Sequence, residues 1–320
     1  NRRVSHVSGK NIENESIVNM PNWLPLTFRI EEDDWFLPED VELHSYEQVL
    51  DMAGGILNRK LVCSDDEGRT TRLNQRRFAH MGRRHLAGLS TVIVPENWSG
   101  SLTVKTALDG NVYNAQVKRY QQLDNHHLQP VDQGTDGRQT IWIQVETNQS
   151  HIKVGLAART CIFLNGVRIS PDRDNSVREG YAGQEITMEL EEGDELRIEK
   201  TAAYYTSRDH GISECLLEAR NDVFKAPGFH ELLFEHVMGW QRLWNRGCIS
   251  CAGPEVDTQR IVNLHIFHLL QTVSAYSIDM DVGVPPRGLH GEAYRGLIMW
   301  DELFIFPFLD LRIPDLTRTL

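Results

Sequence analysis

Apolar and polar residues alternate with a period of two in several short stretches of the first 225 residues. The alternation is clearest over 102–106, 141–146, 186–190 and 196–198. Segments rich in Asp, Asn, Glu and Gly separate the stretches, at 65–68, 109–111, 136–137, 165–166 and 191–194. Many short strands joined by such turns are typical of an antiparallel sandwich with one buried and one solvent-exposed face. We therefore expect an all-β domain, without a long helix, up to about residue 225.

The spacing of the apolar residues changes after about residue 225. Between Phe229 and Trp244 they recur at helical spacing, and Pro227-Gly228 marks the break in front of them. The stretch 261–273 is apolar on nearly every side, which predicts a deeply buried helix.

The last forty residues predict a loop and then a further helix. Gly and Pro are frequent at 281–296, which favours a loop, and 301–320 has a helical pattern interrupted by Pro307 and Pro314. Two or three helices of this kind cannot enclose a core, so their apolar surface needs a partner. They pack onto the sandwich or onto another chain, or the 320 residues are the front of a longer protein, which is the interpretation we favour.

Composition and charge narrow the classes of partner. The chain has 33 Lys and Arg against 45 Asp and Glu, a net charge of −12, which argues against nucleic acid and membranes as partners. No stretch has the 18 or more consecutive apolar residues of a membrane-spanning helix, and Asn1 begins no signal-peptide pattern. Five cysteines, an odd number, indicate free thiols in a reducing compartment, so we expect a cytoplasmic protein. The missing initiator Met leaves room for an upstream segment.

The segment 281–302 has the composition of a ligand-binding loop. Its polar and aromatic side chains include Arg287, His290, Glu292, Tyr294, Arg295, Trp300, Asp301 and Glu302. An indole face stacks on the apolar face of a sugar ring, and a neighbouring carboxylate accepts hydrogen bonds from its hydroxyls. Trp300-Asp301 is thus a candidate sugar-binding pair, and a tryptophan of the core is the alternative.

Histidines elsewhere are weaker candidates. His265 and His268 have a spacing that can bind a metal but no accompanying carboxylate, so we expect histidines of a buried helix and no metal site. His126-His127 lies in a polar stretch and is expected in a solvated loop. The basic stretch 76–85 is expected to form a sheet-surface patch or a domain contact. The sequence contains neither a phosphate-binding loop nor a serine-hydrolase elbow.

Five blocks, spread over nearly the whole chain, stand in the order of one known family. They are ENESIVNMPNWLPLTFRI (13–30), LDMAGGILNRKLV (50–62), RRFAHMGRRHLAGL (76–89), IVNLHIFHLLQTVS (261–274) and VPPRGLHGEAYRGLIMWDELFIFPF (284–308). Together they resemble glycoside hydrolase family 65, which contains phosphorylases of maltose, trehalose, kojibiose and nigerose, and the acid trehalases.

The resemblance implies a fold and a division of the chain. The family has an N-terminal antiparallel β-sandwich (a galactose-mutarotase-like super-sandwich), a helical linker, an (α/α)6 barrel and a small C-terminal β domain. We accordingly expect the sandwich over 1–225, the linker over 226–255 and the first segment of the catalytic barrel over 256–320.

The resemblance also implies which residues bind substrate. Trp300 and Asp301 fall on the family's Trp-Asp motif, which lines the subsite for the transferred glucosyl unit, and Arg295 and Glu302 lie beside it. We expect these four residues to bind the substrate.

The sequence around the motif departs from the family. The usual His and Phe before the motif are replaced by Leu297 and Met299, and the common Thr-Glu after it is replaced by Glu302-Leu303. These departures leave the preferred disaccharide open.

The implied reaction is inverting phosphorolysis. A Glu general acid protonates the glycosidic oxygen while phosphate attacks the anomeric carbon, which yields β-glucose 1-phosphate. In the family this Glu lies beyond the position of Leu320, so we expect no catalytic residue within the 320 residues and no activity from them alone. The resemblance implies no cofactor, inorganic phosphate as co-substrate, an α-glucoside disaccharide as substrate, and a homodimer as one assembly. A trehalase-like hydrolase and a non-catalytic carbohydrate-binding or structural module are the alternatives.

Overall fold

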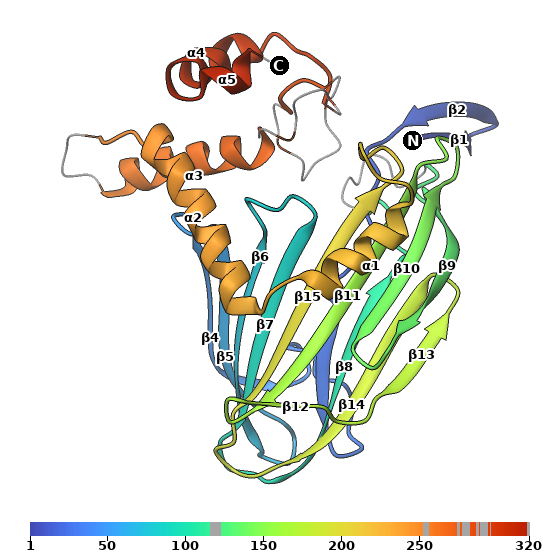
Figure 1. Ribbon diagram of the computed structural model, residues 1–320, viewed down its shortest axis with the longest axis vertical. Coiled ribbons are helices and arrows are strands. Elements are labelled where there is room, and N and C mark those ends of the chain that lie inside the picture. Colours follow the sequence, from blue (N-terminus) through green and yellow to red (C-terminus); the bar gives the residue numbers. More distant parts are fainter. Residues whose placement is uncertain are drawn as a thin grey trace.

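The protein has a strand-rich region followed by helices (Figure 1). The computed structural model describes residues 1–115, 123–251, 256–273, 276, 282–285, 288, 294 and 296–318. The first strands of this part are β1 (Arg2–Val7), β2 (Lys10–Glu15), β3 (Leu26–Ile30), β4 (Glu42–Asp51), β5 (Ile56–Ser64), β6 (Thr70–Ala79), β7 (Leu86–Pro95) and β8 (Gly100–Asp109). The later strands are β9 (Leu128–Asp136), β10 (Thr140–Thr147), β11 (Lys153–Leu164), β12 (Val167–Ile169), β13 (Asp174–Arg178), β14 (Tyr181–Leu190) and β15 (Leu196–Thr206). The helices are α1 (Cys215–Lys225), α2 (Phe229–Gly247), α3 (Val256–Thr272), α4 (Glu302–Arg312) and α5 (Pro314–Thr317).

Two antiparallel sheets face each other and enclose the core. The larger sheet has the order β4-β5-β6-β7-β15-β11-β10-β9, with β12 paired to β11, and the smaller sheet has the order β13-β14-β8-β3. The alternating residues of the sequence point into the space between them, as shown by Leu102 and Val104 of β8 against Ile93 and Ile198 of the larger sheet. The predicted β-sandwich, followed by a helical region, is confirmed.

The outer face of the larger sheet is also covered, which corrects the expectation of an exposed face. Helix α1 and the first turns of α2 pack on β7, β11 and β15 through a second apolar cluster that includes Ala157, Ala203 and Phe229. Every residue of β7 except Val92 is therefore buried. Antiparallel sheets often leave one face in water, but the central strands here are buried on both faces.

Helix α1 corrects the prediction of no long helix before residue 225. The Glu214 carboxylate caps it by accepting hydrogen bonds from the backbone N–H groups of Leu216 (3.0 Å) and Leu217 (2.5 Å). The helix approaches β11 so closely that a β-carbon at Gly155 would lie 2.5 Å from Leu216 Cα. The change from strands to helices therefore occurs before residue 215, and α1 packs against the sandwich.

Helix α3 forms close to its predicted place, but only one side of it is buried. Phe267 and Leu270 are buried, whereas Ile261 is 55% exposed. His265 and His268 are exposed as well, which corrects the expectation of buried histidines. An apolar pattern on nearly every side is thus compatible with a helix that has one exposed side.

The two residues of the His126-His127 pair differ in burial. His127 is buried, and its Nδ1 lies 3.1 Å from Asn1 Nδ2, so the expectation of a solvated His126-His127 loop holds only for His126, which is exposed.

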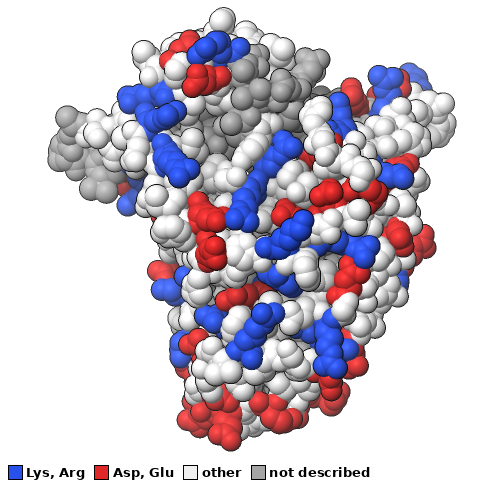
Figure 2. Space-filling view, in the orientation of Figure 1, with Lys and Arg blue, Asp and Glu red and all other residues white. Residues whose placement is uncertain are grey.

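On the face that carries α1 and α2, Lys and Arg are interspersed with Asp and Glu (Figure 2). All five cysteines are free thiols, with Cys63 and Cys161 among the buried ones. Within the described residues, no helix combines the length and the apolar character needed to cross a membrane.

Candidate functional site

The helices that carry the candidate site are attached to the sandwich through α2. His236 is buried on α2; its Nδ1 accepts a hydrogen bond from the Met81 N–H (3.0 Å) and its Nε2 donates to the Gly55 carbonyl (3.1 Å). This pattern requires the neutral Nε2–H tautomer. The two partners belong to the turns of the β6–β7 and β4–β5 hairpins, so one imidazole joins α2 to both hairpins.

Two tryptophans of α2 complete this attachment. Trp244 Nε1 donates to the Met52 carbonyl (2.8 Å), and the indole of Trp240 lies against Gly55 and stacks on Phe267 of α3 with centroids 4.6 Å apart. The two turns lie within the sequence blocks 50–62 and 76–89. Part of the basic stretch 76–85, around Met81, thus contacts α2.

Electrostatics favour neutral histidines at this contact. Burial, and then the neighbouring His236, lower the pKa of His80 to about 4, and burial lowers the pKa of His236. His80 Nδ1 accepts hydrogen bonds from the N–H groups of Gly82 (3.0 Å) and Arg83 (2.9 Å), and an exposed Arg83–Glu235 ion pair lies beside it. Both imidazoles, of His80 and His236, are therefore neutral at neutral pH.

Helix α4 rests on this scaffold and presents the candidate residues. Its buried side packs through Leu309 against Val273 and Val284, and Phe308 packs against the Trp240 cluster on α2 and α3. Pro307 lies inside the helix, whereas Pro314 begins the separate helix α5. The helix predicted over 301–320 is therefore two helices, broken at Ile313.

Trp300 and Asp301 stand at the exposed N-terminal end of α4. The Trp300 side chain is 66% exposed, and its ring meets Phe304 edge to face with centroids 5.7 Å apart. Asp301 occupies the N-cap position, but its carboxylate caps no backbone N–H. The Trp300 indole is thus open to a ligand, and the half-buried Asp301 carboxylate is not used as a helix cap.

Glu302 takes a different position from the substrate contact expected for it. Its side chain is 8% exposed, and Oε1 accepts a hydrogen bond from the Val284 N–H at 3.0 Å. Gly283 makes this possible, because a β-carbon there would overlap the carboxylate. Glu302 therefore fixes the start of α4 to the segment 282–285 and points away from solvent.

The remaining candidates of the loop lie largely outside the described residues. This applies to Arg295, Arg287, His290 and Glu292. Tyr294 is described, is 45% exposed and has a positive φ of 63°. In the part of the chain that the structure describes, no group of three or more His, Cys, Asp or Glu side chains could hold a metal ion.

Trp300 has exposed apolar neighbours in the chain. Ile298, Leu303 and Phe304 are exposed large apolar residues next to it, and Leu311 at the far end of α4 is exposed too. Exposed apolar groups of this number normally face another part of a protein or a ligand.

Comparison with known proteins identifies the family. The model of the glycosyl hydrolase family 65 N-terminal domain matches residues 1–243, and the model of the family 65 central catalytic domain matches residues 263–320. The chain belongs to glycosyl hydrolase family 65. The recognition made from the five sequence blocks is confirmed.

Similar proteins within the family include enzymes of known activity. An uncharacterized glycosyl hydrolase of Mycobacterium tuberculosis is 39% identical over 100% of this chain and 24% of its own length. A kojibiose phosphorylase of Caldanaerobacter subterraneus is 29% identical over 95% of this chain and 40% of its own length. The solved structure of a putative kojibiose phosphorylase from the human microbiome has a TM-score of 0.80 at 16% identity and covers 96% of this chain and 39% of that one. The chain thus spans about a quarter to two fifths of the length of these proteins.

Proposed function

We propose that the full-length protein is an inverting phosphorylase of an α-glucosyl disaccharide. The alignment of nearly the whole chain with family 65 phosphorylases, including the segment that carries Trp300-Asp301, is the observation that carries the proposal. In the proposed reaction, the disaccharide and inorganic phosphate give β-glucose 1-phosphate and a free sugar. The glycosidic C–O bond breaks, a C–O bond to phosphate forms, and the anomeric configuration inverts.

Each residue of the candidate site has a proposed role. Trp300 stacks on the glucosyl ring, Asp301 accepts hydrogen bonds from its hydroxyls, and Arg295 contacts the substrate. Glu302 is proposed as a positioning residue, because its carboxylate is bound to the backbone of Val284. The general acid, a Glu outside the 320 residues, protonates the leaving oxygen, and no cofactor takes part.

The rest of the chain has a proposed supporting role. We assign residues 1–225 to the sandwich, 226–255 to the helical linker and 256–320 to the first segment of the catalytic barrel. We also propose a cytoplasmic protein, which the free thiols support, that assembles as a homodimer.

Product analysis with the full-length protein tests the proposal. Maltose, trehalose, kojibiose and nigerose are each incubated with and without inorganic phosphate, and glucose and glucose 1-phosphate are quantified separately. A phosphorylase releases the β-phosphate ester with one of these sugars only when phosphate is present. Release of free glucose at equal rates with and without phosphate would contradict phosphorolysis.

A hydrolase is the second candidate, because the 39% identical relative carries the name glycosyl hydrolase. In that case a carboxylate base activates water in place of phosphate, while the Trp300-Asp301 pair keeps its role. The same experiment distinguishes the two reactions. Neither product from any of the four sugars would favour the third interpretation, a carbohydrate-binding or structural module.

A further inference from the structure

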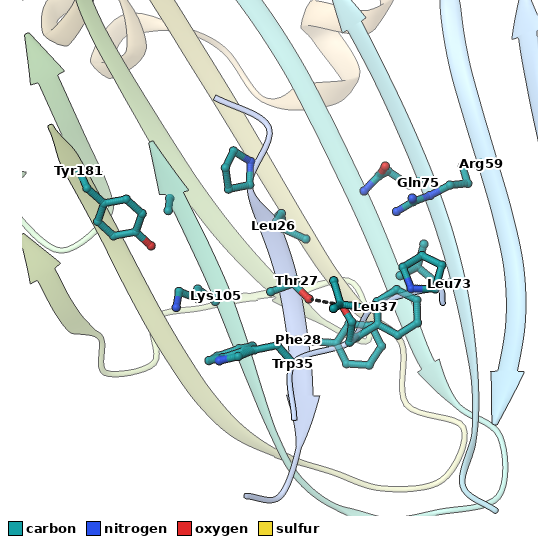
Figure 3. Close-up of a pocket in the computed structure, with 14 residues that line it drawn as sticks. Leu26, Thr27, Phe28, Trp35, Leu37, Arg59, Leu73, Gln75, Lys105 and Tyr181 are labelled. Atoms are coloured by element: carbon teal, nitrogen blue, oxygen red, sulfur yellow. Dashed lines mark hydrogen bonds between the residues drawn. The ribbon is translucent and has the colours of Figure 1, made fainter. Parts of the chain in front are cut away.

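A cavity lies at the edge of the smaller sheet, far in the sequence from Trp300. Strand β3 is the edge strand of that sheet, and β5 and β6 of the larger sheet continue past it. The cavity has a volume of about 430 Å³ and is lined from β3, β5, β6, β8 and the segment 35–38 (Figure 3). This volume falls within the roughly 300–1,000 Å³ of small-molecule pockets.

The charged groups of the lining are both cations. The lining contains Arg59 and Lys105 and no Asp or Glu. Lys105 has a carboxylate partner in Glu185 at 3.5 Å. In the described part of the chain, by contrast, no hydrogen bond or ion pair involves the side chain of Arg59, and its Nε is buried without an acceptor.

A second arginine without a carboxylate stands next to Arg59. The register of β5 and β6 pairs Arg59 with Gln75 and Leu57 with Arg77, so Arg59, Gln75 and Arg77 share one face of the sheet. Burial, and then the Arg59 guanidinium, lower the pKa of Arg77. Two half-buried cations are therefore held together, and within the described residues no carboxylate of the protein compensates their charge.

The other face of the same strands shows that this lack of partners is local. There Lys60 pairs with Glu47 (3.8 Å) and Arg72 pairs with Glu96 (2.7 Å). In a chain with a net charge of −12, carboxylates are plentiful. An anion from outside the protein would supply the missing charge on the cavity side.

The shape of the cavity indicates the class of anion. Planar guanidinium groups match the oxygens of a phosphate, with two parallel N–H···O bonds from each. Figure 3 shows Arg59 and Gln75 on one side of Leu26, and Trp35 and Tyr181 on the other. Aromatic side chains of this kind pack on the apolar faces of sugar rings.

We propose that Arg59 and Arg77 bind the phosphate group of a small phosphorylated sugar, whose ring extends along the cavity toward Trp35. The site is separate from Trp300-Asp301 and does not depend on the proposed reaction.

Hydrogen exchange of the full-length protein, followed by mass spectrometry, tests this site locally, with glucose 6-phosphate as the probe. We expect slower amide exchange in peptides that cover 24–38 and 56–64. The Arg59→Gln and Arg77→Gln variants should each raise the half-saturating concentration at least about tenfold, since each removes charge-assisted hydrogen bonds to the phosphate. Arg72→Gln is the matched control, because it removes a cation from the opposite face of β6, and it should leave the half-saturating concentration unchanged.

Several outcomes would overturn the proposal. One is the absence of protection in the unaltered protein. Another is unchanged half-saturation in both the Arg59 and the Arg77 variant, provided that they show the thermal unfolding of the parent. A third is equal protection by glucose. Equal affinity for inorganic phosphate and glucose 6-phosphate would reject the sugar part of the proposal. Because Arg59 and Arg77 lie in the sandwich, binding of phosphate at a distant catalytic site should not depend on them.

Discussion

The indole of Trp240 on α2 fills the space in front of Gly55, where any β-carbon would overlap the ring. Gly55 has φ +66°, a left-handed conformation that glycine adopts without strain. Gly55→Ala therefore combines backbone strain with overlap, and we expect the free energy of unfolding to fall by about 2–5 kcal/mol. Chemical denaturation measures this loss.

Gly68→Ala is the control for Gly55→Ala. Gly68 also has a positive φ, +76°, but nothing lies within 4 Å of the position of an added β-carbon. This variant should lose only the strain contribution, about 1–2 kcal/mol. Equal losses in the two variants would show that Trp240 does not restrict position 55.

Acid should weaken the contact between the sandwich and α2. Burial lowers the pKa of His80 to about 4, whereas histidine in an unfolded chain titrates near ~6.5. The stability contributed by neutral His80 is full above about pH 6.5 and is lost as the pH falls through about 4, because the unfolded chain binds the proton first. At about 1.4 kcal/mol per unit, this loss is on the order of 3 kcal/mol.

His80→Asn tests that titration. Its side-chain oxygen can replace Nδ1 as the acceptor for the Gly82 and Arg83 N–H groups, yet it carries no ionisable proton. We expect the free energy of unfolding to depend less steeply on pH between 6.5 and 4 than in the parent protein. Identical slopes would rule out His80 as the source.

Lys200 should produce a trend of the same sign at alkaline pH. It is fully buried, its ammonium group donates to the carbonyls of Ala107 (2.8 Å) and Pro25 (3.1 Å), and burial lowers its pKa to about 7. Between about pH 7 and the unfolded pKa of about 10.4, the unfolded chain binds more protons than the folded chain, so stability rises with pH. Relative to Lys200→Met, the parent protein should gain stability across this range in denaturation curves. Parallel pH profiles would contradict the shift.

Trp300→Ala and Asp301→Asn should each lower the turnover of the full-length protein at least about tenfold, through lost binding of the transferred glucosyl unit. Both side chains lie at the exposed end of α4, so thermal unfolding should change little. Phe224→Ala on α1 is an exposed aromatic control outside the loop and should keep full turnover. Near-normal kinetics in both test variants would exclude the proposed subsite.

The two obvious replacements of Glu302 should behave differently. Gln retains an oxygen that accepts from the Val284 N–H, whereas Ala leaves this buried N–H unpaired. We expect Glu302→Gln to keep most of the activity and Glu302→Ala to lose it, as measured by steady-state kinetics. Equal loss in both variants would point to a direct role of the charge in substrate binding.

Much of the sandwich was predictable from sequence because its inward positions obey a strict period of two. Ile141, Ile143 and Val145 of β10 are fully buried, as their alternation with polar residues predicts. Helix α1 was missed, although its buried residues Leu216, Ala219 and Val223 recur at helical spacing, because the helix is only 11 residues long. The need for a glycine at position 155 could not be predicted either, because it arises from the contact between β11 and the capped start of α1 at Glu214.

The sequence named the residues of the candidate site but could not give their orientation. Trp300 is exposed and Asp301 is half-buried at the start of α4. Glu302 is their neighbour in sequence, yet it turns inward because Gly283 leaves room for its carboxylate. The roles of His236 and Arg59 depend on residues more than fifteen positions away, so no local pattern reveals them.

The contacts of α2 with the two hairpin turns determine how α3 and α4 are oriented relative to the sandwich. The first turns of α2 rest on the sheet at Phe229 and Leu232, and its middle is held by the turns at 51–55 and 79–85. A 19-residue helix is about 28 Å long. Because it is held at its first turns and at its middle, these two contacts fix the direction of its axis. A residue inserted into either turn would swing α3 and α4, with Trp300, relative to the sandwich. The same insertion at 191–194, which lies at the opposite end of β7 beside Pro95, would leave the helices in place.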